Sequence, residues 1–287
     1  MRNTIVLISL WWLATFVSVA QTSGKLAQVK SSPDQVEVQY RFQDRSITLN
    51  EPVELLFLVH NGLSRPVTLT LGAEKTQFFQ FSLRTPDGRT LHDYRNPGDN
   101  VSIVIFGPIK TTVEPGADYQ QSILINKWFK FETVGTYFLT SQLTTGIETS
   151  EGAVLPLQDN TVRLEVRRRD PVRLENVCAM LAREVEEHLN VEEWQFPARK
   201  LASIDDPIAI PYLGQVLATN KGTETYVIPA LERIGNDEAV NVLLSALSDK
   251  SGDIALLARQ SLTRMQDRIE KPSLRATVRQ ALTSKTE

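Results

Sequence analysis

The feature that most constrains this chain is a repeat of 30 residues in its C-terminal half. The segment "LASIDDPIAIPYLGQVL", residues 201–217, aligns with "LERIGNDEAVNVLLSAL", residues 231–247. Each copy has apolar residues at helical spacing on both sides of a polar turn, which predicts a pair of short helices. Because one such pair cannot bury its own apolar face, the repeat predicts an α-solenoid in which neighbouring pairs stack.

The polar turn inside each copy has a structural explanation. Asp206 and Asn236 occupy equivalent positions just before the second helix, where such a side chain accepts a hydrogen bond from an otherwise unpaired amide. Pro207 follows at the first helical position, where a missing N–H group costs nothing. We therefore interpret Asp206 as a helix cap, and not as half of a catalytic carboxylate pair with Asp205.

The predicted helical domain spans residues 170–285, with capping helices at 174–190 and 272–282. Residues 197–265 resemble HEAT repeats, in particular the short repeats of the phycobilin lyase type. The resemblance implies a surface, formed by the second helix of each pair, that binds other macromolecules. Simple solvation of these positions is the alternative, and a lyase-like activity is a further one. The candidate binding residues on the second helices are Ile208, Tyr212, Gln215, Glu238, Asn241 and Ser245.

Residues 33–169 follow a period of two and contain no amphipathic helix. Turn signals such as "NG", "PDG" and "EPG" separate eight candidate strands, which predicts an antiparallel β-sandwich of immunoglobulin-like type. The candidate strands are 36–42, 52–60, 66–71, 78–84, 101–106, 119–125, 135–143 and 161–167.

The order of strands and turns in this domain resembles the bacterial immunoglobulin-like domains typified by the intracellular proteinase inhibitor family. The matching positions are Asn61, Asp87, Gly88, Pro115, Gly116, Trp128 and 135–137. The resemblance implies the fold, and it raises secreted protease inhibition through the sandwich loops as an alternative function. A long insertion around residues 92–110 and the predicted export depart from the family pattern.

Two short segments of this domain are candidate interaction sites. The aromatic residues Trp128, Phe129 and Phe131 would form a binding edge if exposed, or would close one end of the core if buried. The "RRRD" run at 167–170 continues the last strand, so we interpret it as a solvated strand end that leads into the linker.

The N-terminus has the pattern of a secretory signal peptide over residues 1–20, followed by a flexible linker over 21–32. A retained membrane anchor is the alternative, although the apolar run is short for a membrane span. Without Arg2, 30 of the 31 basic residues remain against 34 acidic ones. This balance of charges lacks the excess of basic residues that nucleic-acid binding needs, so it argues against a nucleic-acid partner. We expect an exported protein, periplasmic or extracellular, with no membrane span after cleavage.

Candidate catalytic groups are few. The single cysteine, Cys178, lies on the apolar face of a predicted helix, which favours a core residue over a reactive thiolate. Glu184 and His188 are four residues apart and could share a metal, but no third ligand follows at metal-site spacing. The sequence therefore predicts a non-catalytic protein-binding or scaffold protein, without cofactor or metal, and a metal-dependent enzyme is the weaker alternative.

Overall fold

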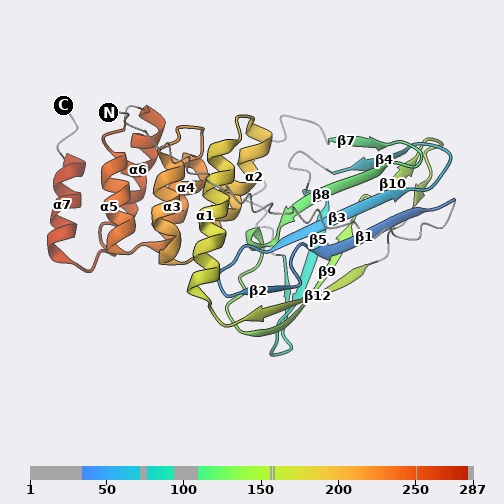
Figure 1. Ribbon diagram of the computed structural model, residues 1–287, viewed down its shortest axis with the longest axis horizontal. Coiled ribbons are helices and arrows are strands. Elements are labelled where there is room, and N and C mark those ends of the chain that lie inside the picture. The colour runs from blue at the N-terminus through green and yellow to red at the C-terminus, as the bar shows by residue number, and fades with distance from the viewer. Residues whose placement is uncertain are drawn as a thin grey trace, which may run out of the picture.

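The computed structural model describes residues 34–71, 76–93, 109–155, 157, 159–249 and 251–283. These residues form a β-rich region followed by a helical region, and the two lie side by side along the long axis of the molecule (Figure 1). The predicted order of a β domain and then an α domain is therefore confirmed. The predicted signal peptide, the 21–32 linker and the predicted strand at 101–106 lie outside the described residues.

Strands occupy the first part of the described chain. They are β1 (Val36–Phe42), β2 (Ser46–Thr48), β3 (Glu54–Asn61), β4 (Val67–Thr70), β5 (Phe79–Arg84), β6 (Thr90–His92), β7 (Lys110–Val113), β8 (Asp118–Leu124), β9 (Gly135–Leu143), β10 (Ile147–Thr149), β11 (Val154–Leu155) and β12 (Asn160–Arg167). The predicted strands that lie within the described residues correspond to β1, β3, β4, β5, β8, β9 and β12. The prediction missed β2, β6, β7, β10 and β11. Four of these have only two or three residues, too few to show a period of two, and β7, "KTTV", has a single apolar residue.

The strands form three sheets, ordered β1-β3-β8, β11-β10-β4-β7 and β2-β12-β9-β5-β6. All described pairings are antiparallel except β2 with β12, which is parallel and aligns Val166 with Ile47. Side chains alternate between the core and the outside, as a one-sided sheet requires. In β5, for example, Phe79, Phe81 and Leu83 are buried, and the residues between them face outward.

The three sheets share one apolar core. Tyr40, Phe57 and Phe79 come from three different strands, and the ring centroids are 5.1 Å apart for Tyr40–Phe57 and 4.9 Å apart for Phe57–Phe79. Tilted and edge-on ring pairs at these separations add to the stabilisation from buried area. The core therefore joins the sheets into one folded unit.

A tyrosine fixes the turn that precedes β9. The Tyr137 hydroxyl donates a hydrogen bond to the Thr133 carbonyl oxygen at 2.9 Å and accepts one from the Thr133 amide at 3.2 Å. The Tyr137 ring is buried and packs 5.1 Å from the Phe131 ring. One side chain thus anchors both the core and the backbone four residues upstream.

The helical region contains seven α-helices among the described residues. They are α1 (Pro171–Glu187), α2 (Val191–Ala202), α3 (Ile210–Leu217), α4 (Glu224–Ile234), α5 (Asp237–Ala246), α6 (Gly252–Met265) and α7 (Pro272–Thr283). In one layer α1 contacts α3, α3 contacts α5 and α5 contacts α7, and in the other α2 contacts α4 and α4 contacts α6. The helices therefore extend away from the β region as a two-layered row (Figure 1).

The 30-residue repeat corresponds to equivalent buried positions. Ala209 and Ala239 are both fully buried, as are Leu213 and Leu243. The cap interpretation is also confirmed, because the Asp206 side chain accepts a hydrogen bond from the Ile208 amide at 3.1 Å. The side chain of its repeat partner, Asn236, accepts one from the Ala239 amide at 2.9 Å.

Candidate functional site

Polar side chains from the two regions meet at a junction, which we define as Thr48, Asn50, Glu51, Glu54, Arg169, Arg173, Lys200 and Asp206. The last residue of β2, the loop after it and the first residue of β3 supply the first four residues. The segment after β12, α1, α2 and the turn before α3 supply the others. Two carboxylates, those of Glu51 and Asp206, have side chains that are only 3% exposed. Buried carboxylates need partners, and each of these has an arginine.

Asp206 is the acceptor at the centre of the first contact. Its carboxylate receives two hydrogen bonds from the Arg169 guanidinium, at 2.6 Å from Nε and 2.8 Å from Nη2. The Asn50 amide donates a third at 2.9 Å. One carboxylate of the helical repeat therefore binds both the β2–β3 loop, through Asn50, and the segment after β12, through Arg169.

The donors around Asp206 stabilise its charged form. The Arg169 hydrogen bonds are the largest cause, and together with the Ile208 amide and the Asn50 side chain they lower the pKa of Asp206 to about 2 in spite of its burial. The equivalent position in the next repeat is Asn236, which caps its helix without a charge. Asp206 thus has a second role, as the anion of an ion pair, that the cap interpretation did not include.

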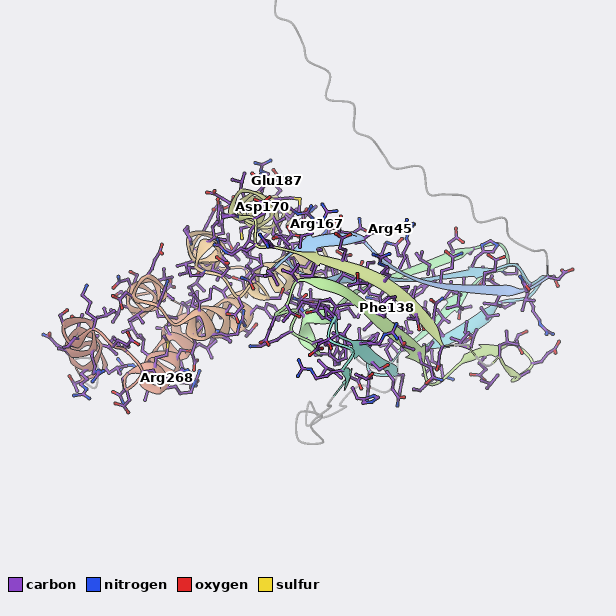
Figure 2. All side chains as sticks on the ribbon, turned by 90° about the horizontal axis from the view of Figure 1, so that it is seen from below. Arg45, Phe138, Arg167, Asp170, Glu187 and Arg268 are labelled. Atoms are coloured by element: carbon purple, nitrogen blue, oxygen red, sulfur yellow. The ribbon has the colours of Figure 1, made fainter. Side chains whose placement is uncertain are left out.

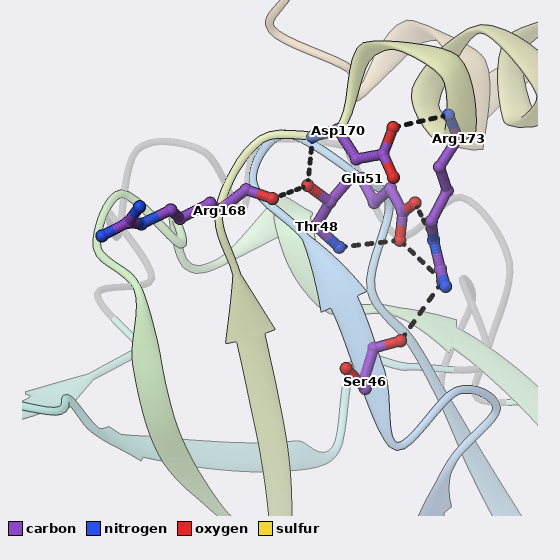
Figure 3. Close-up of polar contacts among 6 residues, drawn as sticks. All are labelled: Ser46, Thr48, Glu51, Arg168, Asp170 and Arg173. Carbon is purple, nitrogen blue, oxygen red and sulfur yellow. Dashed lines mark hydrogen bonds and ion pairs between the residues drawn. The ribbon is translucent and has the colours of Figure 1, made fainter.

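Glu51 is the acceptor of the second contact (Figure 3). The Arg173 guanidinium, on α1, donates to both carboxylate oxygens of Glu51, with Nη2 at 3.0 Å from Oε2. Oε2 also accepts a hydrogen bond from the Thr48 amide at 3.0 Å. Arg173 Nη2 in addition donates to the Ser46 carbonyl oxygen at 3.2 Å. The first turn of α1 is therefore bound directly to the β region.

Two more contacts complete the junction. The buried Thr48 hydroxyl accepts a hydrogen bond from the Asp170 amide at 2.7 Å and donates one to the Arg168 carbonyl oxygen, which holds the linker against the end of β2 (Figure 3). Lys200 Nζ, on α2, lies 2.8 Å from Glu54 Oε2, on β3, and both side chains are less than a fifth exposed. The two regions are thus joined at several points and not only by the chain.

The "RRRD" run is exposed at the end of β12, as the prediction of a solvated strand end requires, but two of its residues also make structural contacts. Arg169 donates to Asp206 from Nε and Nη2, along one edge of its guanidinium. Asp170 caps α1 by accepting a hydrogen bond from the Arg173 amide at 3.1 Å. Arg167 and Arg168 are exposed, and Arg167 pairs with Glu165 on its own strand. The segment is therefore fixed by side-chain and backbone hydrogen bonds on both of its sides.

The candidate binding residues on the second helices lie on one layer of the helical region. Gln215, on α3, is exposed, and so are Glu238, Asn241 and Ser245 on α5. Ile208 and Tyr212 are half-buried and pack against the helical core. Gln215 Nε2 donates to Glu186 Oε1 on α1 at 2.8 Å. We define the exposed residues of this set, together with Tyr212, as the α3–α5 surface.

The aromatic candidates lie elsewhere. Phe129 and Phe131 are 4% and 6% exposed and belong to the β core, so the prediction of an exposed binding edge is wrong for both. Trp128 is half-buried, with its ring 4.9 Å from that of Phe81. These side chains close one end of the core, which was the alternative explanation.

The metal hypothesis for Glu184 and His188 fails on geometry. His188 lies just beyond α1 in an extended conformation, so it does not share a helix face with Glu184. Its Nδ1 lies 3.2 Å from Glu193 Oε2 instead. Among the described residues, no three or more His, Cys, Asp or Glu side chains are grouped so that they could hold a metal ion.

Cys178 is fully buried in the helical core. Burial raises the pKa of its thiol to about 12, and the nearby Asp206 and Glu175 carboxylates act in the same direction. Because the thiolate is the reactive form, we expect Cys178 in the folded protein to react with iodoacetamide roughly a thousandfold more slowly than an ordinary thiol at the same pH. Mass spectrometry after timed alkylation, with urea-unfolded protein as the control, measures this. Comparable rates in the two states would contradict the assignment.

Within the part of the chain that the structure describes, no helix combines the length and the apolar character needed to cross a membrane.

Comparison with known proteins gives one family match. Residues 37–167 match the family model described as flagellar collar protein C, N-terminal domain. The match begins within β1 and ends with β12, so it covers the β region and none of the helices. A comparison with curated proteins gives no match.

Several solved structures are similar to part of the chain at low scores. The structural-genomics target SoR45 is 13% identical over 47% of this chain and 90% of that chain, with a TM-score of 0.27. The Pseudomonas fluorescens alkylpurine DNA glycosylase AlkC, bound to DNA containing an abasic site analog, is 12% identical over 47% of this chain and 31% of that chain, with a TM-score of 0.25. A CARDB domain from Pyrococcus furiosus is 9% identical over 47% of this chain and 99% of that chain, with a TM-score of 0.25. These scores support no argument about activity.

Proposed function

We propose that this chain is an exported, non-catalytic scaffold protein that binds other proteins in an assembly of the flagellar collar type. The observation that carries the proposal is the match of residues 37–167 to the N-terminal domain of flagellar collar protein C, a family whose name denotes a structural component. The junction is consistent with a scaffold, because its two buried carboxylates are occupied by arginines and are not free to act as acids or bases.

The proposal includes the fold of both regions. An immunoglobulin-like sandwich for the β region is supported by the single core between sheets and by Tyr137, whose hydroxyl bonds back to Thr133 as in the tyrosine corner of such domains. A HEAT-like solenoid for the helices is supported by the 30-residue repeat, its equivalent caps at Asp206 and Asn236, and the two-layered row.

We further propose export by a cleaved signal peptide over residues 1–20, with the mature protein in the periplasm or outside the cell. The support is the sequence pattern alone, namely Arg2, the uncharged run after it and the small residues Ser18 and Ala20 before the expected cleavage point. A flagellar collar assembly in an envelope compartment is compatible with this route.

The test uses the organism that encodes the chain, which on this proposal is a flagellated bacterium. A chromosomally tagged protein should co-purify with flagellar basal bodies, and tomograms of the motor should lose a peripheral density when the gene is deleted. The matched control is a strain without basal bodies, where the tagged protein should no longer sediment with that fraction. A deletion strain with an unchanged motor, or a protein that never fractionates with basal bodies, would overturn the proposal.

The α3–α5 surface is the proposed partner-binding site of the scaffold. We expect the double substitution of Tyr212→Ala and Gln215→Ala to weaken capture by basal bodies roughly tenfold, because partly exposed aromatic residues contribute much of the energy at protein interfaces. The matched control is Thr225→Ala with Gln260→Ala, two exposed positions on α4 and α6 in the other layer. Quantitative immunoblotting of basal-body fractions measures capture. Equal loss in both double variants, or no loss in the first, would refute this location.

A further inference from the structure

The outer face of the β2-β12-β9-β5-β6 sheet carries an ordered row of side chains. Arg163 on β12, Phe138 on β9 and Arg84 on β5 are direct cross-strand neighbours, since Phe138 pairs with both arginines in the ladder. Because residues paired across adjacent strands point to the same face, Phe138 lies on that face between the two arginine positions. The Arg84 guanidinium carbon lies 4.4 Å from the Phe138 ring centroid.

This row belongs to a basic surface. Arg84 and Arg163 are exposed, and among the described residues neither has a carboxylate at ion-pair distance. Arg167 lies at the end of β12 that is nearest the helical region (Figure 2), where it neutralises Glu165. We define the sheet surface as Arg84, Phe138, Arg163 and Arg167. It has an aromatic centre and an excess of positive charge.

The turn between α1 and α2 has the opposite character. Leu189 is 86% exposed and Val191 is 57% exposed, which are unusual values for apolar side chains in an ordered turn. Exposed glutamates flank them on both sides. We define the α1–α2 corner as Glu186, Glu187, Leu189, Val191, Glu192 and Glu193.

The corner is ordered and not a loose loop. Lys221 Nζ donates hydrogen bonds to the carbonyl oxygens of Val185, Glu186 and His188 at 2.7, 2.8 and 2.7 Å, which satisfies the end of α1. Asn190 and His188 both contact the Glu193 carboxylate. The exposed apolar pair is therefore presented on a fixed backbone, which lowers the entropy cost of binding.

The sheet surface and the α1–α2 corner have opposite charges, and each has apolar side chains at its centre. Within one chain the two surfaces are too far apart to meet. The α1–α2 corner lies at the far end of α1 from the β region's lower sheet, and Figure 1 shows β12 and β9 at the bottom and the end of α1 at the top. We infer that the sheet surface of one copy binds the α1–α2 corner of a second copy. Such a contact is head-to-tail, so repeating it generates a ring or a filament.

A second copy of this chain is the favoured partner of the sheet surface, because the chain itself carries both of the complementary surfaces. The arginines of the sheet surface oppose the glutamates of the corner, and Phe138 offers an apolar centre for Leu189 and Val191. Contacts of this kind gain specificity and association rate from charge, and they weaken as salt rises. The inference concerns the purified protein alone and does not depend on the flagellar proposal.

The test is sedimentation velocity of the purified protein over a wide concentration range at low and high salt. We expect the weight-average mass to rise with concentration at low salt and to fall toward the monomer at high salt. Arg84→Glu with Arg163→Glu should weaken association roughly tenfold or more, and so should Glu187→Lys with Glu192→Lys, because each places like charges against each other. The protein with all four substitutions should associate again, since both signs are then reversed.

The matched control is Arg41→Glu with Lys110→Glu, which makes the same charge change at exposed positions on the other two sheets and should associate as the wild type does. Circular dichroism of each variant checks that the fold is retained. The inference is overturned if the wild type is monomeric throughout, if association is indifferent to salt, if the control weakens it equally, or if the fourfold variant stays monomeric.

Discussion

Arg169→Ala is expected to lower the free energy of unfolding by about 3 kcal/mol, because it leaves the buried Asp206 carboxylate without its guanidinium partner. The value lies at the low end for a broken buried pair, since the Arg169 side chain is 43% exposed and Asp206 keeps the Ile208 and Asn50 donors. Urea unfolding followed by circular dichroism and tryptophan fluorescence measures the change.

A double-mutant cycle separates the ion pair from the helix cap. Asp206→Asn recreates the residue that the next repeat uses, so it should retain the cap and lose only the pair. The double variant Arg169→Ala/Asp206→Asn should be more stable than Arg169→Ala alone, because a neutral amide is easier to bury than an unpaired carboxylate. Asp205→Asn, at a side chain that is 43% exposed, is the control and should change stability little. A double variant less stable than both singles would contradict the assignment.

The same pair predicts a pH dependence. The pKa of Asp206 is lowered from 3.8 to about 2, so its contribution is fully present above about pH 4 and is lost as the pH falls toward 2. The stability difference between wild type and Arg169→Ala should therefore narrow over this interval, as unfolding curves at stepped pH would show. A difference that stays constant down to about pH 2 would mean that Arg169 acts through something other than this carboxylate.

Asn61→Ala is expected to lower the free energy of unfolding by about 2 to 4 kcal/mol, because one fully buried amide serves three backbone groups. Its Nδ2 donates to the carbonyl oxygens of Arg65 and Val113, both at 2.9 Å, and its Oδ1 accepts from the Leu63 amide at 3.1 Å. The substitution leaves these groups unpaired between the end of β3, the loop after it and the end of β7.

The comparison that isolates this effect is Asn61→Asp, which keeps the acceptor for Leu63 but loses both donated hydrogen bonds and buries a charge. It should be at least as destabilising as the alanine variant. Asn190→Ala, at an exposed position without a side-chain cap bond, should leave the unfolding midpoint near that of the wild type. Thermal and urea unfolding give both values. If Asn61→Ala lowered the free energy of unfolding by less than Asn190→Ala does, the Asn61 hydrogen bonds would not contribute to stability as stated.

The helical region was predictable in detail because its signal is local and repeated. The offset of 30 residues pairs Ala209 with Ala239 and Leu213 with Leu243, and all four are fully buried. Caps at Asp206 and Asn236 followed from residue type and position. The long strands were equally visible through their period of two, whereas β2 and β10, at three residues each, carry no measurable period.

The junction was not predictable from the sequence, because its partners are far apart in the chain and individually ordinary. Glu51 and Arg173 are 122 residues apart, and Asn50 and Asp206 are 156 residues apart. The one available signal was the change from Asn236 to Asp206 between equivalent caps, which adds a charge where a cap needs none. For Phe129 and Phe131, residue type alone could not separate an exposed edge from a core.

The place where α1 joins the β region has a mechanical consequence. The helices continue directly from β12, which lies inside its sheet between the parallel strand β2 and the antiparallel strand β9. A force that pulls the helices away along β12 acts across two rows of hydrogen bonds at once, because ladder bonds run nearly perpendicular to the strands. Both rows are loaded in shear, so their hydrogen bonds must break together. An edge strand, in contrast, can be peeled away one hydrogen bond at a time. The connection between the two regions therefore resists tension better than an attachment to an edge strand would.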